Sequence, residues 1–426
     1  MGSSRKSFGS VAARLVSLPC PFRRLATTPP RGFIYVAIAR GRDRGHDNPC
    51  IRQLHQPRAS HRSFGAVVNS QILIRHVIAT SVLAIVAMLP GLAPLEASAS
   101  EATPTATPSA LRRIILRPDE SRFRLLPLTN YVNTAFDTAQ VSRAFSQDNY
   151  WRNHERVLDR IAHPFSNIED DGGWDHFFRQ EFASGAVLPN LTLHLLGNGY
   201  DFRALAEWYD AHHVPWAYFW AFVTSYAGYL GNEAIELSNP EIDATDSIAD
   251  LYIFNLAGNL LFISDTVTDV VHNRWQLRNW PGQPVFDVRR REVRNASNNY
   301  VLRPDLGSEH VRPFLYLGLH YFVGLSLSLP AQKGLSLGAG LATKDPFKED
   351  DLDKVQPSGG LFWDDDNRLL ASVVFNGTDE SIVRLNVYPD LLHNRILDVG
   401  FFLGLARDGV PTCGIAIEKL LAFGLS

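Results

Sequence analysis

The sequence of 426 residues contains only three cysteines, and two of them, Cys20 and Cys50, lie within its first 70 residues. If those residues are absent from the mature protein, Cys413 is the only cysteine that remains. A single cysteine can form neither an intramolecular disulfide nor a metal site built from cysteine ligands. We therefore expect the mature fold to be stabilised without either feature.

Basic residues are scarce beyond residue 70. Residues 1–70 carry an excess of ten positive charges, whereas the rest of the chain carries an excess of thirteen negative charges. A nucleic-acid-binding protein needs basic side chains to neutralise phosphates, and an acidic body repels them. We find no phosphate-binding glycine loop of the P-loop type. We therefore expect neither nucleic acid nor nucleotide as a partner, and the sequence does not indicate any protein partner.

Residues 71–99 have the order of a secretory signal. A basic pair precedes the apolar run 77–89, which is followed by a Pro-Gly break and by Ala97-Ser98-Ala99. The run is well short of the roughly 20 residues that a membrane-spanning helix needs. A basic start, a short apolar centre and a small-x-small site are typical of a signal peptide. We predict cleavage after Ala99.

The remaining segments suggest a domain plan. Residues 1–70 are Arg-rich, and we interpret them as a disordered upstream extension created by a misplaced start codon, with an organelle transit segment as the alternative. Residues 100–110 are a Thr/Pro/Ala linker. We expect a helical domain over 111–284 and a β domain over 285–426.

Two apolar segments predict a helical hairpin in the first domain. Residues 214–232 carry no charge and place small residues three or four apart, which allows a second helix to approach closely. Residues 247–271 are also apolar and open with the Ser-x-x-Asp spacing of a capping box at Ser247 and Asp250. Residues 238–241, between the two segments, contain a helix-stopping proline. We therefore expect the two helices to pack on each other as a buried or interfacial hairpin.

The acidic residues of this hairpin form two pairs. Glu233 and Glu236 lie three apart at the end of the first helix, and Asp246 and Asp250 lie four apart at the start of the second. An antiparallel hairpin brings both pairs to one end, where four carboxylates cannot all stay charged without a metal ion, basic partners or raised pKa values. His212 and His213 are further residues that can join such a site. The candidate catalytic residues are His194, Glu233, Glu236, Asp246 and Asp250.

A structural explanation of the same residues stays open. Aspartates at the start of a helix are favoured by N-capping and by the helix dipole, and glutamates at a helix end can simply be solvated. A histidine on an apolar face is often a hydrogen-bonded core residue. The sequence identifies no metal and no cofactor, so both remain unknown.

Short motifs in residues 190–265 resemble uncharacterised bacterial envelope families of unknown function. The resemblance lies in His194-x-x-Gly197, Glu233-x-x-Glu236 and Ser247-x-x-Asp250 followed by Gly258. It implies a location in the periplasm or outer membrane and implies that the polar positions belong together. It implies no reaction.

The second domain shows a period of two. In residues 314–329 one alternate set is almost entirely leucine and valine, whereas the other contains glycine, serine and aromatic residues. The same contrast recurs in 335–342 and 397–406. We predict about eight antiparallel strands that close into a small β-barrel, which gives an α+β fold. An outward aliphatic face with a small or polar interior is typical of an outer-membrane barrel, with a soluble barrel around the apolar hairpin as the alternative.

These patterns predict an exported envelope protein of a Gram-negative bacterium, in the outer membrane or periplasm. We expect it to contact membrane or envelope lipid in a structural or binding role. The alternative is a hydrolase or acyl transferase that acts on lipid or cell-wall material through the His/Glu/Asp cluster. An open channel is disfavoured because eight strands enclose a lumen just wide enough for side chains.

Overall fold

The structure is a computed structural model of the whole chain. It describes residues 111–117, 126–137, 147–184, 187–237, 243–287, 292–308, 310–343, 355–375, 381–392, 399–406, 409–417 and 420–425. All of these residues belong to one compact unit, residues 66–426. The predicted upstream extension, signal peptide and linker lie outside the described residues, so these assignments stay predictions.

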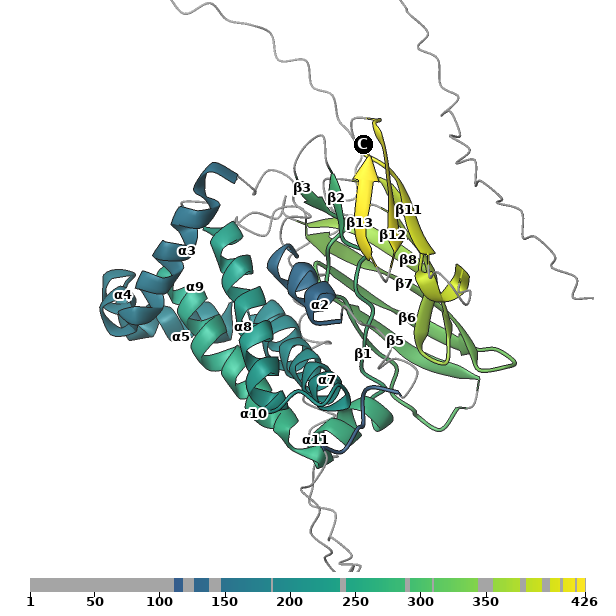
Figure 1. Cartoon of the computed structure of the whole chain (residues 1–426), viewed down its shortest axis with the longest axis horizontal. Helices are drawn as coiled ribbons and strands as arrows, with labels where there is room; N and C mark the ends of the chain where they lie inside the picture. Colours follow the sequence, from purple (N-terminus) through teal and green to yellow (C-terminus); the bar gives the residue numbers. More distant parts are fainter. Residues whose placement is uncertain are drawn as a thin grey trace, which may run out of the picture. The chain divides into compact units, whose positions relative to one another are not determined.

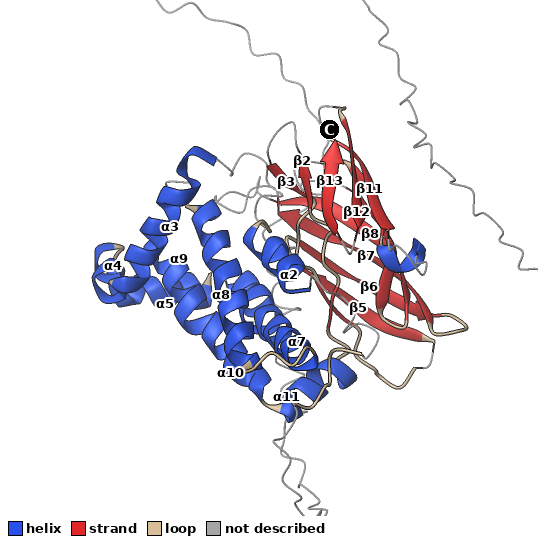
Figure 2. Cartoon of the chain, viewed as in Figure 1, coloured by secondary structure: helices blue, strands red, loops and turns tan. Residues whose placement is uncertain are grey.

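The described chain has an α+β fold, as predicted. Helices come first along the chain and strands follow, and the helices gather on one side of the sheet (Figure 1 and Figure 2). The helical segments are α2 (Leu126–Ala135), α3 (Gln147–Ala162), α4 (Pro164–Asp170), α5 (Gly173–Ala183), α6 (Val187–Pro189), η4 (Asn190–Gly197), α7 (Asn198–Ala211), α8 (Ala217–Glu236), α9 (Ala244–Ile248), η5 (Ala249–Phe254), α10 (Asn255–Ile263), α11 (Asp265–Asp269), η6 (Val270–Arg274) and, among the strands, the short 3₁₀ helix η8 (Pro389–Leu392). Three of them, η4, η5 and η6, are π-helical.

The two predicted halves of the hairpin are present, but they do not pack along their length. The contact joins the C-terminal half of α8 to the start of the second half, where Tyr229 and Leu251 share a core and the Tyr226 hydroxyl donates a hydrogen bond to the Leu251 carbonyl at 2.8 Å. Elsewhere α7 packs against both α8 and α10. The small residues of α8 face other partners, since Ser225 donates to Asn198 of α7 and Gly228 lies against Thr134 of α2. Small residues thus predicted a close approach correctly but identified the wrong partner.

The predicted capping box is wrong. The helix begins at Ala244, one turn earlier than expected, so Ser247 and Asp250 lie inside a continuous helical segment. Asp243 occupies the N-cap position, and its side chain makes no capping hydrogen bond. The Pro-containing loop predicted at 238–241 lies outside the described residues.

The strands form one curled sheet that is not closed. The strands are β1 (Arg278–Asn279), β2 (Val285–Asp287), β3 (Glu292–Arg294), β4 (Tyr300–Leu302), β5 (Val311–Leu317), β6 (His320–Ser328), β7 (Lys333–Thr343), β8 (Val355–Asp365), β9 (Arg368–Phe375), β10 (Val383–Val387), β11 (Val399–Leu405), β12 (Pro411–Ile417) and β13 (Leu420–Leu425). Ten of them, β4 to β13, pair antiparallel in chain order, with β1 beside β4 and with β2 and β3 beyond β13. Among the described strands β1 and β3 have no pairing with each other, so the sheet is a half-barrel.

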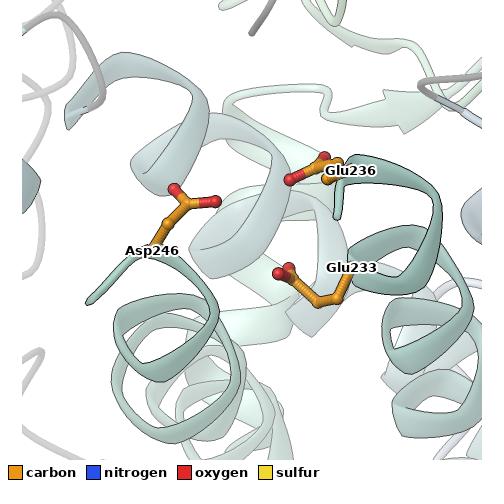
Figure 3. Close-up of side chains that lie close together, drawn as sticks. All are labelled: Glu233, Glu236 and Asp246. Atoms are coloured by element: carbon orange, nitrogen blue, oxygen red, sulfur yellow. The ribbon is translucent and has the colours of Figure 1, made fainter. Parts of the chain in front are cut away.

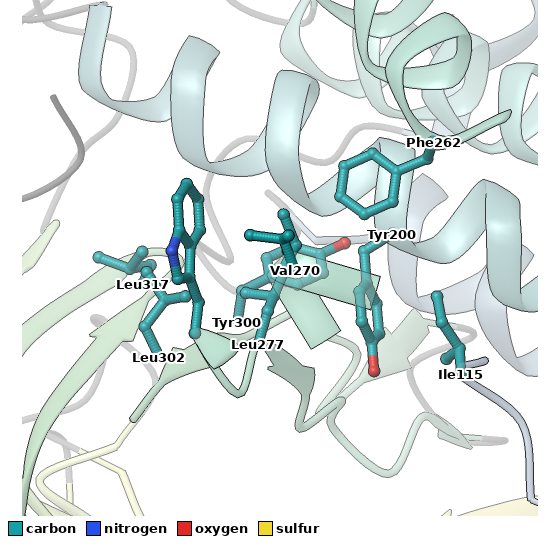
Figure 4. Close-up of a cluster of buried hydrophobic side chains, with 10 residues drawn as sticks. Ile115, Tyr200, Phe262, Val270, Leu277, Tyr300, Leu302 and Leu317 are labelled. Carbon is teal, nitrogen blue, oxygen red and sulfur yellow. The ribbon is translucent and has the colours of Figure 1, made fainter. Parts of the chain in front are cut away.

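The predicted closed barrel of about eight strands is therefore wrong, because other parts of the chain fill the concave face. Trp280, only 2% exposed, packs with its ring centroid 6.1 Å from Phe314 and 5.6 Å from Phe362. On the opposite face of β4 and β5, helices and sheet share a second core that includes Tyr200, Phe262 and Tyr300 (Figure 4). A sheet whose inner face is covered in this way needs no closure to bury its apolar side chains.

The single long strand predicted over 314–329 is a hairpin of β5 and β6. Tyr316 pairs with Phe322 and Leu317 with Tyr321 around a tight turn. Directly paired residues point to the same face of a sheet. Because each of these pairs is separated by an even number of residues, the period of two continues through the turn and hides it. Leu319 belongs to the expected outward set, but it lies in this turn and is only 7% exposed.

The outward orientation holds for Leu325, Leu337 and Leu403, which are at least half exposed, but Leu317 on the same face is only 3% exposed and packs in the core shared with the helices. One row of directly paired residues crosses eight strands on the outer face, and it consists of Pro313, Leu325, Leu337, Leu361, Val373, Leu385, Leu403 and Cys413. The inner face is more aromatic than expected, because Phe314, Phe322 and Phe362 are all buried there. Glycine makes room for these rings, since a Cβ at Gly360 would lie 2.6 Å from the Phe362 ring.

His320 gives the sheet a dependence on pH that can be measured. Its side chain is 2% exposed beside the Tyr316 and Phe322 rings, and its Nε2 has no hydrogen-bond partner. Burial, aided by the charge of Arg384, lowers its pKa to about 3. Between the unfolded value of about 6.5 and this value, only the unfolded chain gains a proton, so stability falls as the pH falls.

We therefore expect His320→Phe to reduce the acid sensitivity of folding. Wild-type protein should lose about 2 kcal/mol of unfolding free energy at this residue between pH 8 and pH 5, and the variant should not. Urea unfolding at the two pH values measures the difference, with the exposed His212→Phe as the control. Equal losses in wild type and in His320→Phe would contradict the prediction.

Candidate functional site

Three carboxylates meet where α8 ends and α9 begins. Glu233 and Glu236 occupy the last turn of α8, and Asp246 lies in the first turn of α9 (Figure 3). One oxygen of each carboxylate lies within 4.8 Å of the others. The structure thus brings together three of the four acids that the sequence placed at one end of the helix pair.

Glu233 is the most constrained member of this acidic cluster. Its side chain is completely buried, and neither of its carboxylate oxygens accepts a hydrogen bond of normal geometry, although Ser247 lies close enough to lower its pKa slightly. Burial and the neighbouring Asp246 raise the pKa of Glu233 to about 8. Glu236 is partly exposed, and Asn232 donates a hydrogen bond to it at 2.8 Å. Burial, Glu233 and Asp246 raise its pKa well above the ordinary value.

Arg160 of α3 supplies positive charge beside the cluster. Its guanidinium donates hydrogen bonds to the Asp243 carbonyl at 3.0 Å and to the Ser247 hydroxyl at 3.5 Å. Its charge also lowers the pKa of Glu233, but less than burial and Asp246 raise it. One guanidinium is too little to neutralise three carboxylates, so the cluster has a surplus of negative charge or holds protons.

Asp250 belongs to a separate hydrogen-bonded pair with His194. The Asp250 Oδ2 atom lies 3.1 Å from His194 Nε2, and His194 Nδ1 lies 3.3 Å from Asn255 Oδ1. Burial lowers the pKa of His194 to about 4, and burial with Asp246 and Glu233 raises the pKa of Asp250. The lowered pKa of His194 and the raised pKa of Asp250 both favour the neutral forms of these side chains. We therefore assign a neutral pair, in which the Asp250 carboxyl donates to His194 Nε2 and the Nδ1–H group of His194 donates to Asn255.

The local backbone that positions this pair is unusual. His194 lies in η4 and Asp250 in η5, and both segments are π-helical. Single π-helical turns inside α-helices occur frequently at functional sites. His212 and His213, by contrast, precede the N-terminus of α8, at the opposite end of that helix from the acidic cluster, and both are exposed. The structure therefore does not bring them to the site.

A second candidate site is a cavity of about 600 Å³ between the helices and the sheet. Its wall includes residues of α2 and α7, the segments 115–117 and 278–286, and the turn between β8 and β9. The apolar side chains of this wall include Ile115, Leu126, Leu128, Val132, Ala204, Leu205, Trp280, Val285, Phe286, Val293 and Leu369. The volume lies within the range of small-molecule sites, which are mostly apolar with a few precisely placed polar groups.

Several polar groups on the cavity wall bond to protein atoms, whereas Asn133 Nδ2, Asn279 Oδ1 and Gln283 Oε1 have no hydrogen-bond partner among the described residues. Asp201 accepts hydrogen bonds from Asn130, Asn279 and Tyr300, each at 2.9 Å, and burial raises its pKa to about 6. His272 Nδ1 lies 3.0 Å from the Tyr200 hydroxyl. The sequence offered no motif for this cavity. Asp201 shares α7 with three other charged residues, Arg203, Glu207 and Asp210, so the local sequence did not set it apart.

Two charged side chains of the cavity wall also bond to protein atoms. Arg117 forms an ion pair with Asp366, and Arg278 donates to the carbonyls of His272 and Leu277 at 2.7 Å. A ligand in the cavity therefore gains little from carrying charge, and apolar contact is the main interaction that this wall can offer.

A serine pattern in the sequence does not form a catalytic site. Residues 334–338 read Gly-Leu-Ser-Leu-Gly, which matches the nucleophile elbow of serine hydrolases. An elbow requires a sharp turn between a strand and a helix. Ser336 lies instead in the middle of β7, fully buried, and donates to the Ser326 hydroxyl at 2.9 Å. Its role is to satisfy a polar group on the inner face.

Comparison with known proteins found no matching family model, no similar curated protein and no similar solved structure. The resemblance to bacterial envelope families therefore stays a prediction. Any function proposed for the chain rests on the geometry of its structure.

The neutral assignment of the His194 and Asp250 pair predicts different costs for two variants. Asp250→Asn keeps a donor for His194 Nε2 and should cost about 1 kcal/mol or less, whereas Asp250→Ala leaves that nitrogen unpaired and should cost about 1–3 kcal/mol. Urea unfolding at pH 7 measures both. A cost of about 3–5 kcal/mol for Asp250→Asn would show instead that the pair is ionised, since one buried charge would then lose its partner.

Proposed function

We propose that the protein is an exported envelope protein that associates with the outer membrane through the outer face of its curled sheet and holds an apolar ligand. The observation that carries this proposal is the aliphatic outer face. Leu325 is 56% exposed, Leu337 63% and Leu403 50%. The outward face of a solvated sheet normally alternates polar residues with the buried apolar set. A continuous aliphatic face of this kind marks a surface for lipid or for a partner.

Residues at the end of a central strand support a lipid contact. At one end of β7, the Lys333 ammonium lies 5.6 Å from the centre of the Trp363 ring. Tryptophan and lysine are typical of the membrane–water interface, where the ring and the charge reach different depths.

Association by one face fits the open sheet better than insertion across the bilayer. An open sheet edge inside the hydrocarbon would leave backbone groups without hydrogen bonds. Among the described residues no single helix is long and apolar enough to cross a membrane. Two consecutive helical segments, Ala244–Ile263 and Asp265–Arg274, reach the required length and apolarity only when they are taken together, and a bend of 94° separates them. The predicted signal peptide supports export to the envelope of a Gram-negative bacterium.

The hydrolase or acyl transferase alternative has less support. Both ring nitrogens of His194 contact protein partners, so the side chain has no nitrogen free to act as a base on a substrate. The five predicted site residues also lie apart from the wall of the cavity. These contacts favour a structural role for His194 and Asp250.

Arginine substitutions test the membrane contact. We expect Leu337→Arg and Leu403→Arg to weaken binding to lipid vesicles, because each variant loses the burial of a leucine, worth about 1.5–3 kcal/mol, and places a charge at the membrane interface. Vesicle flotation of the mature chain measures binding. Leu306→Arg is the matched control, since Leu306 is 73% exposed in a loop outside the outer rows. Flotation of all three variants at the wild-type level would show that the outer face contacts no lipid.

A second test addresses the cavity. The apolar fluorophore N-phenyl-1-naphthylamine should bind the protein and be displaced by dodecanoic acid. Ala204→Phe places a ring in the cavity and should weaken binding by about tenfold, or about 1.4 kcal/mol, because the ring occupies volume that the probe needs.

Ala211→Phe is the matched control, because Ala211 lies at the end of the same helix and outside the cavity wall. Equal affinity in both variants would place the probe elsewhere and would contradict the proposed ligand site.

A further inference from the structure

We propose that Glu233, Glu236 and Asp246 bind one divalent cation with hard oxygen ligands, and that Ca²⁺ fits the site. This inference concerns the helical part of the protein and does not rest on the membrane contact. It begins from the convergence of three carboxylates within 4.8 Å across the junction of α8 and α9.

The position of Glu233 is the second observation that points to a ligand. Its side chain is 0% exposed, and neither carboxylate oxygen has a hydrogen-bond partner. A buried polar atom without a partner costs about 1–3 kcal/mol, and more when it carries charge. Figure 3 shows the Glu233 carboxylate directed toward the space that Glu236 and Asp246 also border. A cation in that space would give the buried oxygens the partner that the described protein atoms do not provide.

The charges around this space leave room for a cation. Arg160 contributes one positive charge, and its guanidinium is hydrogen-bonded to Asp243 and Ser247. The neighbouring pair of His194 and Asp250 is neutral in the assignment above. Three carboxylates against one guanidinium leave an excess of two negative charges, which equals the charge of one divalent ion.

The ligand atoms select the type of ion. Oxygen-only sites suit Mg²⁺, Ca²⁺ or Mn²⁺, whereas Zn²⁺ prefers sites with nitrogen or sulfur. Calcium bonds to oxygen at about 2.3–2.6 Å in flexible geometry, so two ligands on opposite sides of one ion lie up to about 5 Å apart. Mg²⁺ requires shorter bonds and near-ideal octahedral geometry. The separation of up to 4.8 Å between the carboxylate oxygens therefore fits Ca²⁺ best.

The exposure of the three residues provides an entry path. Glu233 forms the buried end of the site, whereas Glu236 and Asp246 are partly exposed. Water can complete the coordination from that side, as it does in many calcium sites. A bound ion would join the end of α8 to the start of α9, so it should stabilise the folded protein.

Calorimetric titration with Ca²⁺ alone tests the site. The protein is first stripped with a chelator, and wild type should then bind one Ca²⁺ per chain and show a higher melting temperature in its presence. Glu233→Gln and Glu236→Gln should each weaken binding by at least about tenfold, as changes around metal sites do. Mg²⁺ and Mn²⁺ titrations under the same conditions should show weaker binding.

The matched control is Glu155→Gln on α3, which removes the same charge from an exposed position outside the cluster. It should bind Ca²⁺ as wild type does. If Glu233→Gln does not fold, as judged by circular dichroism, the partly exposed Glu236→Gln decides the question. Wild-type affinity weaker than about 1 mM, or unchanged affinity in the folded cluster variants, would overturn the proposal.

Discussion

The buried carboxylate of Asp201 joins the helices to the sheet. It extends from α7 and accepts hydrogen bonds from Asn130 of α2, Asn279 of β1 and Tyr300 of β4, all at 2.9 Å. Four elements from distant parts of the chain therefore depend on one side chain that is 7% exposed. The shared core, the cavity wall and the position of α2 against the concave face all require this junction.

The two faces of the sheet differ in what covers them. The segment that contains Trp280 packs against the aromatic side chains of the concave face, so they are buried without closure of the sheet. On the convex face the helices cover Leu317, whereas Leu325, Leu337 and Leu403 of the leucine row are at least half exposed. The acidic cluster lies in the helical part, among contacts between α3, α8 and α9. The molecule thus separates an apolar outer surface, an apolar cavity and a charged site.

The sequence predicted features that depend on local spacing. The alternation of leucines identified the outward face, and the spacing of Glu233, Glu236 and Asp246 identified their convergence. It failed where the partner is distant in the chain. Gly228 signalled a close approach but not that Thr134 would be the neighbour. The turn at Leu319 left the period of two intact, and no local pattern could reveal that Asp201 would meet Tyr300.

The unbroken pairing of the leucine row limits how the length of this chain can change. Successive residues of a strand point to opposite faces, so inserting or deleting one residue inside β7 would turn every side chain beyond that point over. Leucines would then enter the aromatic interior, and the aromatic residues would face outward. A change of two residues preserves the two faces, whereas a change of one residue requires a β-bulge, such as the register shift between Trp363 and Asp364 of β8.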